Sequence, residues 1–231
     1  MDYERFLDRF GIADPEMASL LNLHYTRLFE GCQHVVDLGC GKGLFLEALR
    51  SLGISCQGVD QNENLCCTVR DKGISCLSTD VIRYLEEAPD ASCTGLYASH
   101  VIEHLRHEQL EAFLNQSRRV LAPGGRIVLV FPDCESLPMQ LYAFWKDPTH
   151  VRFYHKEYVV FALEELGFAA RIEEPYHMKI ETNCERLPLK KRIIKSIQSF
   201  FQRQLGISDL RSDMKHLRTA TGEACVVADL P

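Results

Sequence analysis

The sequence predicts a doubly wound α/β fold, in which helices cover both faces of a seven-stranded, mostly parallel sheet. From residue 34 onwards, short apolar runs rich in β-branched residues alternate with longer amphipathic stretches, and the connections between them are short. Residues that carry chemistry follow several of the apolar runs, at the ends where ligands bind in such sheets. The expected strands are 34–39, 55–60, 74–78, 94–99, 126–131, 168–177 and 224–229, and the expected helices are 43–51, 62–72, 107–120 and 155–166.

Helical segments are expected to flank this core within a single domain, 1–231. Residues 1–30 contain one or two amphipathic stretches, and the core is expected to span 31–177. A helical insertion is expected over 178–222, followed by a last strand within 223–231. Inside the insertion, the pattern of 188–205 predicts a basic amphipathic helix. We interpret this helix as a lid or a homodimer contact, and binding to an anionic membrane surface is the less favoured alternative.

Composition and charge limit the classes of protein to consider. The chain has 231 residues, of which 46% are hydrophobic and 25% are charged, as in ordinary globular domains. No apolar run approaches the ~20 residues that a membrane span needs, and the N-terminal sequence MDYERFLDRFG lacks the apolar stretch of a signal peptide. A net charge of −6 argues against a nucleic-acid partner, and ten cysteines without a C-x-x-C pair indicate reduced thiols. We therefore expect a cytoplasmic protein.

The first strand of the core, in HVVDLGCGKGLFL, ends in an acidic residue and a glycine-rich turn. Gly39, Gly41 and Gly43 allow a sharp turn and leave room for a ligand close to the backbone. A dinucleotide-binding turn, G-x-G-x-x-G, would need a glycine where Leu44 stands. Asp37, two residues ahead of the turn, would repel a pyrophosphate but suits a ligand with an ammonium group. The turn therefore predicts a small-molecule site and argues against an NAD-linked oxidoreductase.

The second and third strands are also followed by acidic residues. Asp60 comes a little over 20 residues after Asp37, and a carboxylate at that strand end can accept hydrogen bonds from both ribose hydroxyls of an adenosine. Asp80, in STDVIRYL, suits the N-cap of a helix that starts near Val81. Together with the glycine turn, Asp60 predicts a ligand that contains adenosine.

Further motifs make residues 34–132 resemble the class I S-adenosylmethionine (SAM) dependent methyltransferases. They are YASHVIEHL at the end of the fourth strand and VLAPGGRIVLVFP around the fifth. The resemblance implies a Rossmann-like fold with SAM as the cofactor. It implies that the methionine end of SAM is held by Asp37, Gly39, Cys40, Gly41 and Gly43. The ribose would be held by Asp60 and Gln61, and the adenine by Asp80 and Val81. Ser99 and His100 would border the sulfonium.

Residues 144–168, FWKDPTHVRFYHKEYVVFALEELGF, resemble a segment that lies over the active site in bacterial and archaeal methyltransferases, often ones that modify sugars or surface polysaccharides. In such a fold the loop after the fifth strand faces the transferable methyl group, so His150 is the expected general base. His100 and His104, in the other active-site segment, are further catalytic candidates. The resemblance implies O-methylation of a small or carbohydrate-like acceptor, to which a histidine base contributes about 10² to 10⁴-fold.

The same histidines leave two alternatives open. If a helix begins near His100, then His100, Glu103 and His104 share one face. With His150 they would make a set of nitrogen and carboxylate ligands for a divalent metal. This resembles the E-x-x-E-H site of the small-RNA 3′-end 2′-O-methyltransferases, but His100 replaces the first glutamate, and we predict no metal. The other alternative is a SAM-binding regulatory or partner protein without catalysis, which the histidine-rich segments argue against.

Overall fold

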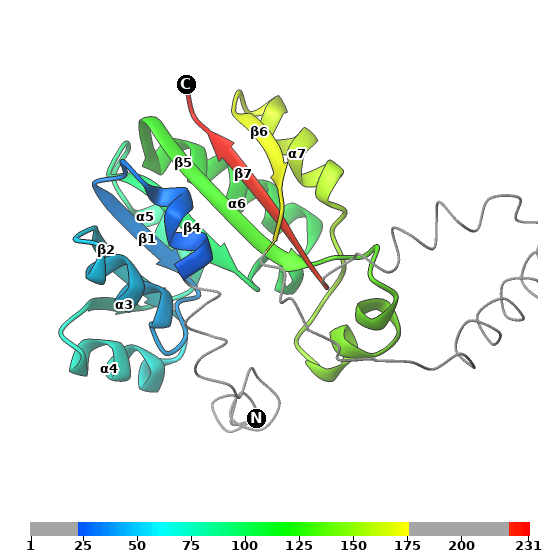
Figure 1. The fold of residues 1–231 in the computed structure, drawn as a ribbon, viewed down its shortest axis with the longest axis horizontal. Coiled ribbons are helices and arrows are strands. Elements are labelled where there is room, and N and C mark those ends of the chain that lie inside the picture. The colour runs from blue at the N-terminus through cyan, green and yellow to red at the C-terminus, as the bar shows by residue number, and fades with distance from the viewer. Residues whose placement is uncertain (1–22, 176–221) are drawn as a thin grey trace, which may run out of the picture.

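The computed structural model describes residues 23–175 and 222–231, which form one sheet with helices on both faces (Figure 1). The strand order is β3-β2-β1-β4-β5-β7-β6. The doubly wound, seven-stranded sheet expected from the sequence is therefore confirmed. Its strands are β1 (His34–Leu38), β2 (Ser55–Asp60), β3 (Ser75–Ser78), β4 (Cys93–Ser99), β5 (Leu121–Pro132), β6 (Ala169–Glu173) and β7 (Glu223–Asp229).

Among the described strands, only β7 runs against its neighbours. β1 pairs in parallel with β2 and β4, and the outer pairs β2 with β3 and β4 with β5 are also parallel. β7 lies antiparallel between β5 and β6. The chain proceeds outward from β1 to β3 and then begins β4 on the other side of β1, so the direction of winding reverses there. Ligands of such sheets bind beyond the carboxyl ends of the strands at this reversal.

Helices α5, α6 and α7 cover one face of the sheet, and α3 and α4 cover the other (Figure 1). Alternation along the strands produces the two layers: Ile127, Leu129 and Phe131 of β5 face the first, and Val128 and Val130 face the second. A strand buried on both faces has a continuous apolar sequence, as β5 does. The helices are α3 (Leu44–Ser51), α4 (Glu63–Asp71), α5 (Val81–Glu87), α6 (His107–Val120) and α7 (Lys156–Glu165), with short 3₁₀ turns at Arg27–Phe29, Ile102–His104 and Phe144–Lys146 and a π-helical turn at Met139–Ala143.

Three helices begin at side-chain caps. Asn62 accepts a hydrogen bond from the Asn64 N–H at the start of α4, and His155 accepts one from the Glu157 N–H at the start of α7. Asp80 caps α5 in the same manner. These caps satisfy N–H groups that have no partner inside the helix. Since α4 and α5 directly follow β2 and β3, their first turns lie at the carboxyl edge of the sheet.

Most strand boundaries lie within one residue of the expected ones, and two differ by more. β5 begins at Leu121 instead of 126, because the APGG segment continues the strand and the pairing with β4 shifts register between Cys93 and Gly95. β6 ends at Glu173, short of the expected 177, and residues 176–177 lie outside the described part of the chain. The apolar pattern locates the strands but does not reveal an irregular strand start.

Several expectations concern residues outside the described ranges. The expected N-terminal helices fall largely within 1–22, and only residues 23–29 of that segment are seen, as helical turns. The expected insertion lies at 178–222, and its basic helix at 188–205 has no described residue. The division of the chain into these segments therefore stays a prediction. Within the described residues, no helix has the length and apolar character needed to cross a membrane.

Candidate functional site

The glycine turn after β1 folds back over the end of β2. The N–H groups of Gly39 and Cys40 both donate to the carbonyl oxygen of Val59, at 2.7 and 3.0 Å. Gly39 has φ +80°, and a Cβ there would stand 2.7 Å from Cγ2 of Val101, in the segment after β4. Only glycine combines this backbone conformation with such a close approach. The turn is thus packed tightly between the ends of β2 and β4.

Asp60 fixes the outer side of this turn. Its Oδ2 accepts a hydrogen bond from the Gly41 N–H at 3.0 Å, and its Oδ1 accepts one from the Asn62 N–H at 2.8 Å. Burial raises the pKa of the Asp60 carboxyl, and the two backbone N–H groups oppose that shift. A Cβ on Gly41 would meet no described atom within 4 Å, so the turn leaves open space beside this carboxylate. Each oxygen retains a lone pair that can accept from a ribose hydroxyl.

Asp37 is an acid buried at the centre of the sheet. It is 3% exposed and lies in β1, paired with Gly58 of β2 and Tyr97 of β4. Burial, followed by the charge of Asp60, raises the pKa of Asp37 well above its usual value. A buried carboxyl of this kind at a ligand edge is a marker of a functional site. A cationic ligand group would stabilise its charged form.

The remaining predicted cofactor residues lie along the same edge. Asp80 accepts hydrogen bonds from the N–H groups of Ile82 and Arg83 at 2.9 and 3.2 Å, so its predicted role as an N-cap is confirmed. Its expected contact with adenine stays a prediction. The other members of the set are Gln61, exposed after β2, Val81, the first residue of α5, and Ser99, the last residue of β4.

His100 follows β4 in a left-handed conformation, with φ +56°, which is rare for a non-glycine residue. Its Nδ1 lies 3.0 Å from Glu103 Oε1, and its Nε2 lies 3.1 Å from Glu223 Oε1. Both partners are carboxylates, which only accept, so both ring nitrogens carry hydrogens. Burial lowers the pKa of His100, but hydrogen bonds to Glu103 and Glu223 and their charges outweigh it, and the pKa lies well above its usual value.

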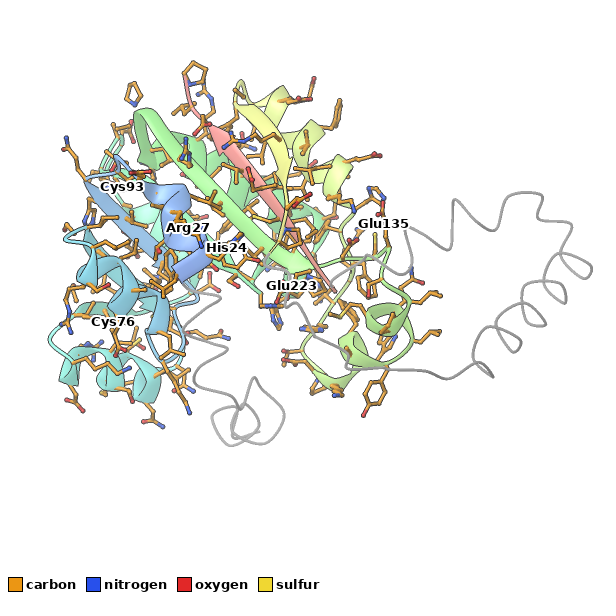
Figure 2. All side chains as sticks on the ribbon, in the orientation of Figure 1. His24, Arg27, Cys76, Cys93, Glu135 and Glu223 are labelled. Carbon is orange, nitrogen blue, oxygen red and sulfur yellow. The ribbon has the colours of Figure 1, made fainter. Side chains whose placement is uncertain are left out.

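Glu223 is a site residue that the sequence does not reveal. It starts β7, and because β7 is antiparallel, this first residue pairs with Pro132 at the carboxyl end of β5. Figure 2 labels Glu223 at the start of this strand. Its carboxylate also accepts a hydrogen bond from the Tyr25 hydroxyl at 3.4 Å. The only sequence signal is its place ahead of the last apolar run, which becomes informative once that strand is known to be antiparallel.

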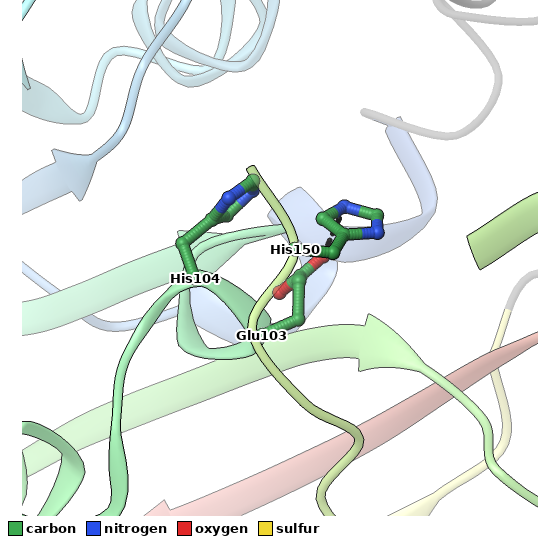
Figure 3. A group of neighbouring side chains, drawn as sticks. All are labelled: Glu103, His104 and His150. Atoms are coloured by element: carbon green, nitrogen blue, oxygen red, sulfur yellow. Dashed lines mark ion pairs between the residues drawn. The ribbon is translucent and has the colours of Figure 1, made fainter. Parts of the chain in front are cut away.

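Glu103, His104 and His150 form a compact group beside His100 (Figure 3). The rings of His104 and His150 are 4.8 Å apart between centroids, and Nε2 of His150 lies 3.9 Å from Glu103 Oε1. The N–H of Val151 donates to the Glu103 carbonyl oxygen at 2.8 Å, which ties the two segments together. The expected approach of His150 to His104 is therefore present in the structure.

The expectation that a helix begins near His100 and places His100, Glu103 and His104 on one face is wrong. Instead of a helix from His100, the structure has a single 3₁₀ turn at Ile102–His104. The backbone of His100 is left-handed, so His100 lies outside that turn. Its ring there pairs with Glu103 and Glu223. His100 therefore pairs with Glu103 and Glu223, and of the two histidines only His104 lies beside His150.

His150 is held as a neutral base. Its Nδ1 lies 2.7 Å from the carbonyl oxygen of Phe144, which only accepts, so the hydrogen is on Nδ1 and the lone pair on Nε2. Burial lowers the pKa of His150, against the opposing effect of the Phe144 carbonyl. The ring of Phe144 packs on the imidazole with centroids 4.5 Å apart. This orientation and charge state suit a proton acceptor at neutral pH.

A known protein family matches most of this chain. Residues 3–171 match the family described as Methyltransferase domain. The chain belongs to this family. Its structure is similar to that of a SAM-dependent methyltransferase from Archaeoglobus fulgidus, with 28% identity, a TM-score of 0.75 and coverage of 99% of this chain and 100% of that one. It shares its fold with phosphoethanolamine N-methyltransferase 2 of Haemonchus contortus in complex with SAM, at 17% identity and TM-score 0.61, over 100% of this chain and 60% of that one.

Curated relatives of this methyltransferase domain match it over a shorter stretch. The mitochondrial ubiquinone biosynthesis O-methyltransferase of Mus musculus is 37% identical over 103 residues, which are 41% of this chain and 27% of that protein. The Homo sapiens protein of the same name is 35% identical over 107 residues, with coverages of 41% and 27%. The chain thus spans about a quarter of the length of these relatives. The expected class, a SAM-dependent methyltransferase domain with SAM as its cofactor, is confirmed.

Proposed function

We propose that this methyltransferase domain methylates a hydroxyl group of a small or carbohydrate-like acceptor, with His150 as the general base. The observation that carries the proposal is the fixed orientation of His150, whose Nδ1 donates to the Phe144 carbonyl at 2.7 Å while Nε2 keeps its lone pair. A hydroxyl acceptor needs such a base, because its proton must leave as the oxygen attacks. An O-directed reaction also agrees with the names of the curated relatives.

The described residues fit SAM. The open space beside Gly41 lets a ligand approach the backbone of the turn, and Asp37 supplies a buried carboxylate for the ammonium group of the methionine end. Asp60 is positioned to accept hydrogen bonds from the ribose hydroxyls. When bound, SAM supplies an electrophilic methyl group on a sulfonium sulfur. The other proposed binding residues are Gly39, Cys40, Gly43, Gln61, Asp80, Val81 and Ser99.

The protein's contribution to the transfer is mainly alignment. His150 would accept the hydroxyl proton on Nε2 as the acceptor oxygen bonds to the methyl carbon, in line with the carbon–sulfur bond. That bond would break with its electron pair staying on sulfur, which leaves S-adenosylhomocysteine. Fixing the two reactants in this geometry lowers the barrier by about 7–11 kcal/mol in model systems. His104 is close enough to His150 to orient the acceptor, and His100 holds its charge beside them. These assignments divide the histidines into one base and two positioning groups.

Exposed aromatic side chains support a carbohydrate-like acceptor. Tyr142 and Trp145 are both 67% exposed and lie in the turns that lead into His150. Aromatic faces of this kind can pack against the apolar face of a sugar ring or another flat acceptor. The acceptor would then be held between the aromatic turns and the histidine group.

Release of S-adenosylhomocysteine with a panel of acceptors tests this function. The full chain is incubated with SAM and with sugars, polyols, phenols and amines, and the product is quantified. We expect turnover with at least one hydroxyl acceptor. Turnover with amines alone would refute the O-directed assignment. SAM binding without turnover across the panel would instead favour the non-catalytic binding protein.

A further inference from the structure

We propose that Glu103, His104 and His150 bind a divalent transition-metal ion. One ligand atom from each residue lies within 4.8 Å of the others, and Figure 3 shows the carboxylate between the two imidazole rings. Ligand atoms around a tetrahedral ion stand about 3.4 Å apart, given metal–ligand bonds of about 2.1 Å. Small side-chain rotations are enough to close the difference. One carboxylate and two imidazoles make a donor set that suits Mn²⁺, Co²⁺ or Zn²⁺.

Both histidines hold Nδ1 against a backbone carbonyl oxygen. Nδ1 of His150 donates to the Phe144 carbonyl at 2.7 Å, and Nδ1 of His104 lies 3.2 Å from the Thr149 carbonyl. A carbonyl only accepts, so each Nδ1 carries the hydrogen and each neutral ring has its lone pair on Nε2. Metal-binding histidines usually hold their second nitrogen in this way, which fixes the ring and raises the basicity of the coordinating nitrogen.

Glu103 provides a second and independent observation. It is 1% exposed, and its Oε2 is a buried atom without a hydrogen-bond partner among the described residues. The other oxygen, Oε1, is already occupied by His100. A buried charged oxygen without a partner is costly. Oε1 is the oxygen nearest to Nε2 of His150, at 3.9 Å. A cation bound by both oxygens of the Glu103 carboxylate would satisfy Oε2, whereas a general-base role for His150 alone leaves it unexplained.

The surrounding charges permit a cation. His100 is an imidazolium, but it lies between the carboxylates of Glu103 and Glu223, so these three groups together carry one negative charge. The two segments that supply the ligands are also joined before any ion binds. The N–H groups of Val151 and Arg152 both donate to the Glu103 carbonyl oxygen, at 2.8 and 3.3 Å. The site is therefore preorganised, with little chain entropy to lose on binding.

The ion gives the proposed methyl transfer a more specific mechanism, and this catalytic role rests on the O-directed transfer of the proposed function but not on His150 as its base. An acceptor oxygen would complete the coordination, and the cation would lower the pKa of that hydroxyl as it does for bound water. The proton then passes to solvent water, the oxygen forms its bond to the methyl carbon, and the electrons of the broken carbon–sulfur bond stay on sulfur. His150 acts as a ligand in this scheme, which therefore replaces its role as the base.

Manganese binding to the full chain tests the site. Mn²⁺ is the probe because the chain's ten cysteines, as soft thiol ligands, would compete for Zn²⁺. After treatment with EDTA and gel filtration, Mn²⁺ is titrated and free ion is followed by electron paramagnetic resonance. We expect one saturable site per chain. His104→Gln and His150→Gln should each weaken binding by more than about tenfold, and His107→Gln, outside the group, should leave it unchanged.

The outcomes separate this inference from the proposed function. A rise in melting temperature with Mn²⁺ in the parent protein, absent from Glu103→Gln, would support the site even if one histidine variant folds poorly. Absence of saturable Mn²⁺ binding would overturn the site. Undiminished binding in all of Glu103→Gln, His104→Gln and His150→Gln would also overturn it. If EDTA-treated protein keeps full turnover, the catalytic role falls while the methyl transfer stands. If Mn²⁺ binds as expected but no acceptor is methylated, the proposed function fails and the metal site stands.

Discussion

The proposed cofactor half and the proposed acceptor half of this site are built in different ways. The cofactor half, at the ends of β1 to β3, consists of glycines, backbone N–H groups and carboxylates close to each strand end. The acceptor half joins side chains far apart in sequence: His100 contacts Glu223, 123 residues away, and Glu103 lies beside His150. A local pattern of residues therefore specifies the cofactor half, whereas tertiary packing specifies the acceptor half.

The largest effect is expected on the acceptor side. His150→Gln should lower kcat by about 10² to 10⁴-fold, since it removes either the proton acceptor or a metal ligand. The affinity for SAM, measured by calorimetry, should stay within about twofold because no cofactor residue is touched. A loss of SAM affinity as large as the loss of kcat would show that the two halves are not separable. His107→Gln, on the exposed side of α6, is the matched control.

A smaller effect is expected on the cofactor side from Asp60→Ala. The variant removes the acceptor of the Gly41 and Asn62 N–H groups as well as the proposed ribose contact. Hydrogen bonds to a charged group contribute about 1.5–3 kcal/mol each, so SAM affinity should fall by about 10 to 100-fold. Asp71→Ala, at the exposed end of α4, is the control and should bind SAM normally. Unchanged affinity in Asp60→Ala would remove that residue from the cofactor site.

The two halves meet where Gly39 lies close to Val101, and substitutions at these two residues test that contact. Gly39→Ala places a Cβ 2.7 Å from Val101 Cγ2 at φ +80°, and it should lower the free energy of unfolding by about 1–3 kcal/mol. Adding Val101→Ala should restore only part of this loss, because the left-handed backbone stays unfavourable for alanine. Urea denaturation of both single variants and the double variant measures the coupling. Strict additivity of the two changes would exclude a direct contact.

The smallest predicted effect is a proton released when SAM binds. The pKa of Asp37 is raised by burial and by Asp60 in the unliganded protein, and a bound ammonium group would lower it. Between the pKa of Asp37 in the complex and its raised pKa in the free protein, SAM binding therefore expels a proton, so affinity rises with pH in that interval and becomes constant above it. Calorimetry in two buffers with different ionisation enthalpies measures the released proton. Asp37→Asn should abolish the buffer dependence, and its persistence would assign the proton to another group.

The limits of sequence-based prediction follow the same division. β2 and α6 have the predicted bounds, because an apolar run and an amphipathic period are local signals. The role of Asp80 as a cap was predictable for the same reason. The exclusion of His100 from the 3₁₀ turn was not, because it depends on a left-handed residue and two distant carboxylates. Glu223 could not be placed either, since its position depends on the direction of β7.

The pairing of β6 with β7 has a consequence for how acceptor specificity can diversify. β6 ends at Glu173 and β7 begins at Glu223, and the two strands are antiparallel neighbours with Glu173 opposite Cys225. The connection between them therefore leaves and re-enters the sheet at one edge, next to the histidine group. Doubling the length of such a connection costs only about 0.6 kcal/mol in closure entropy. A change in the number of residues between Glu173 and Glu223 therefore has a small entropic cost, and both ends of the connection lie outside the strands of the proposed SAM site.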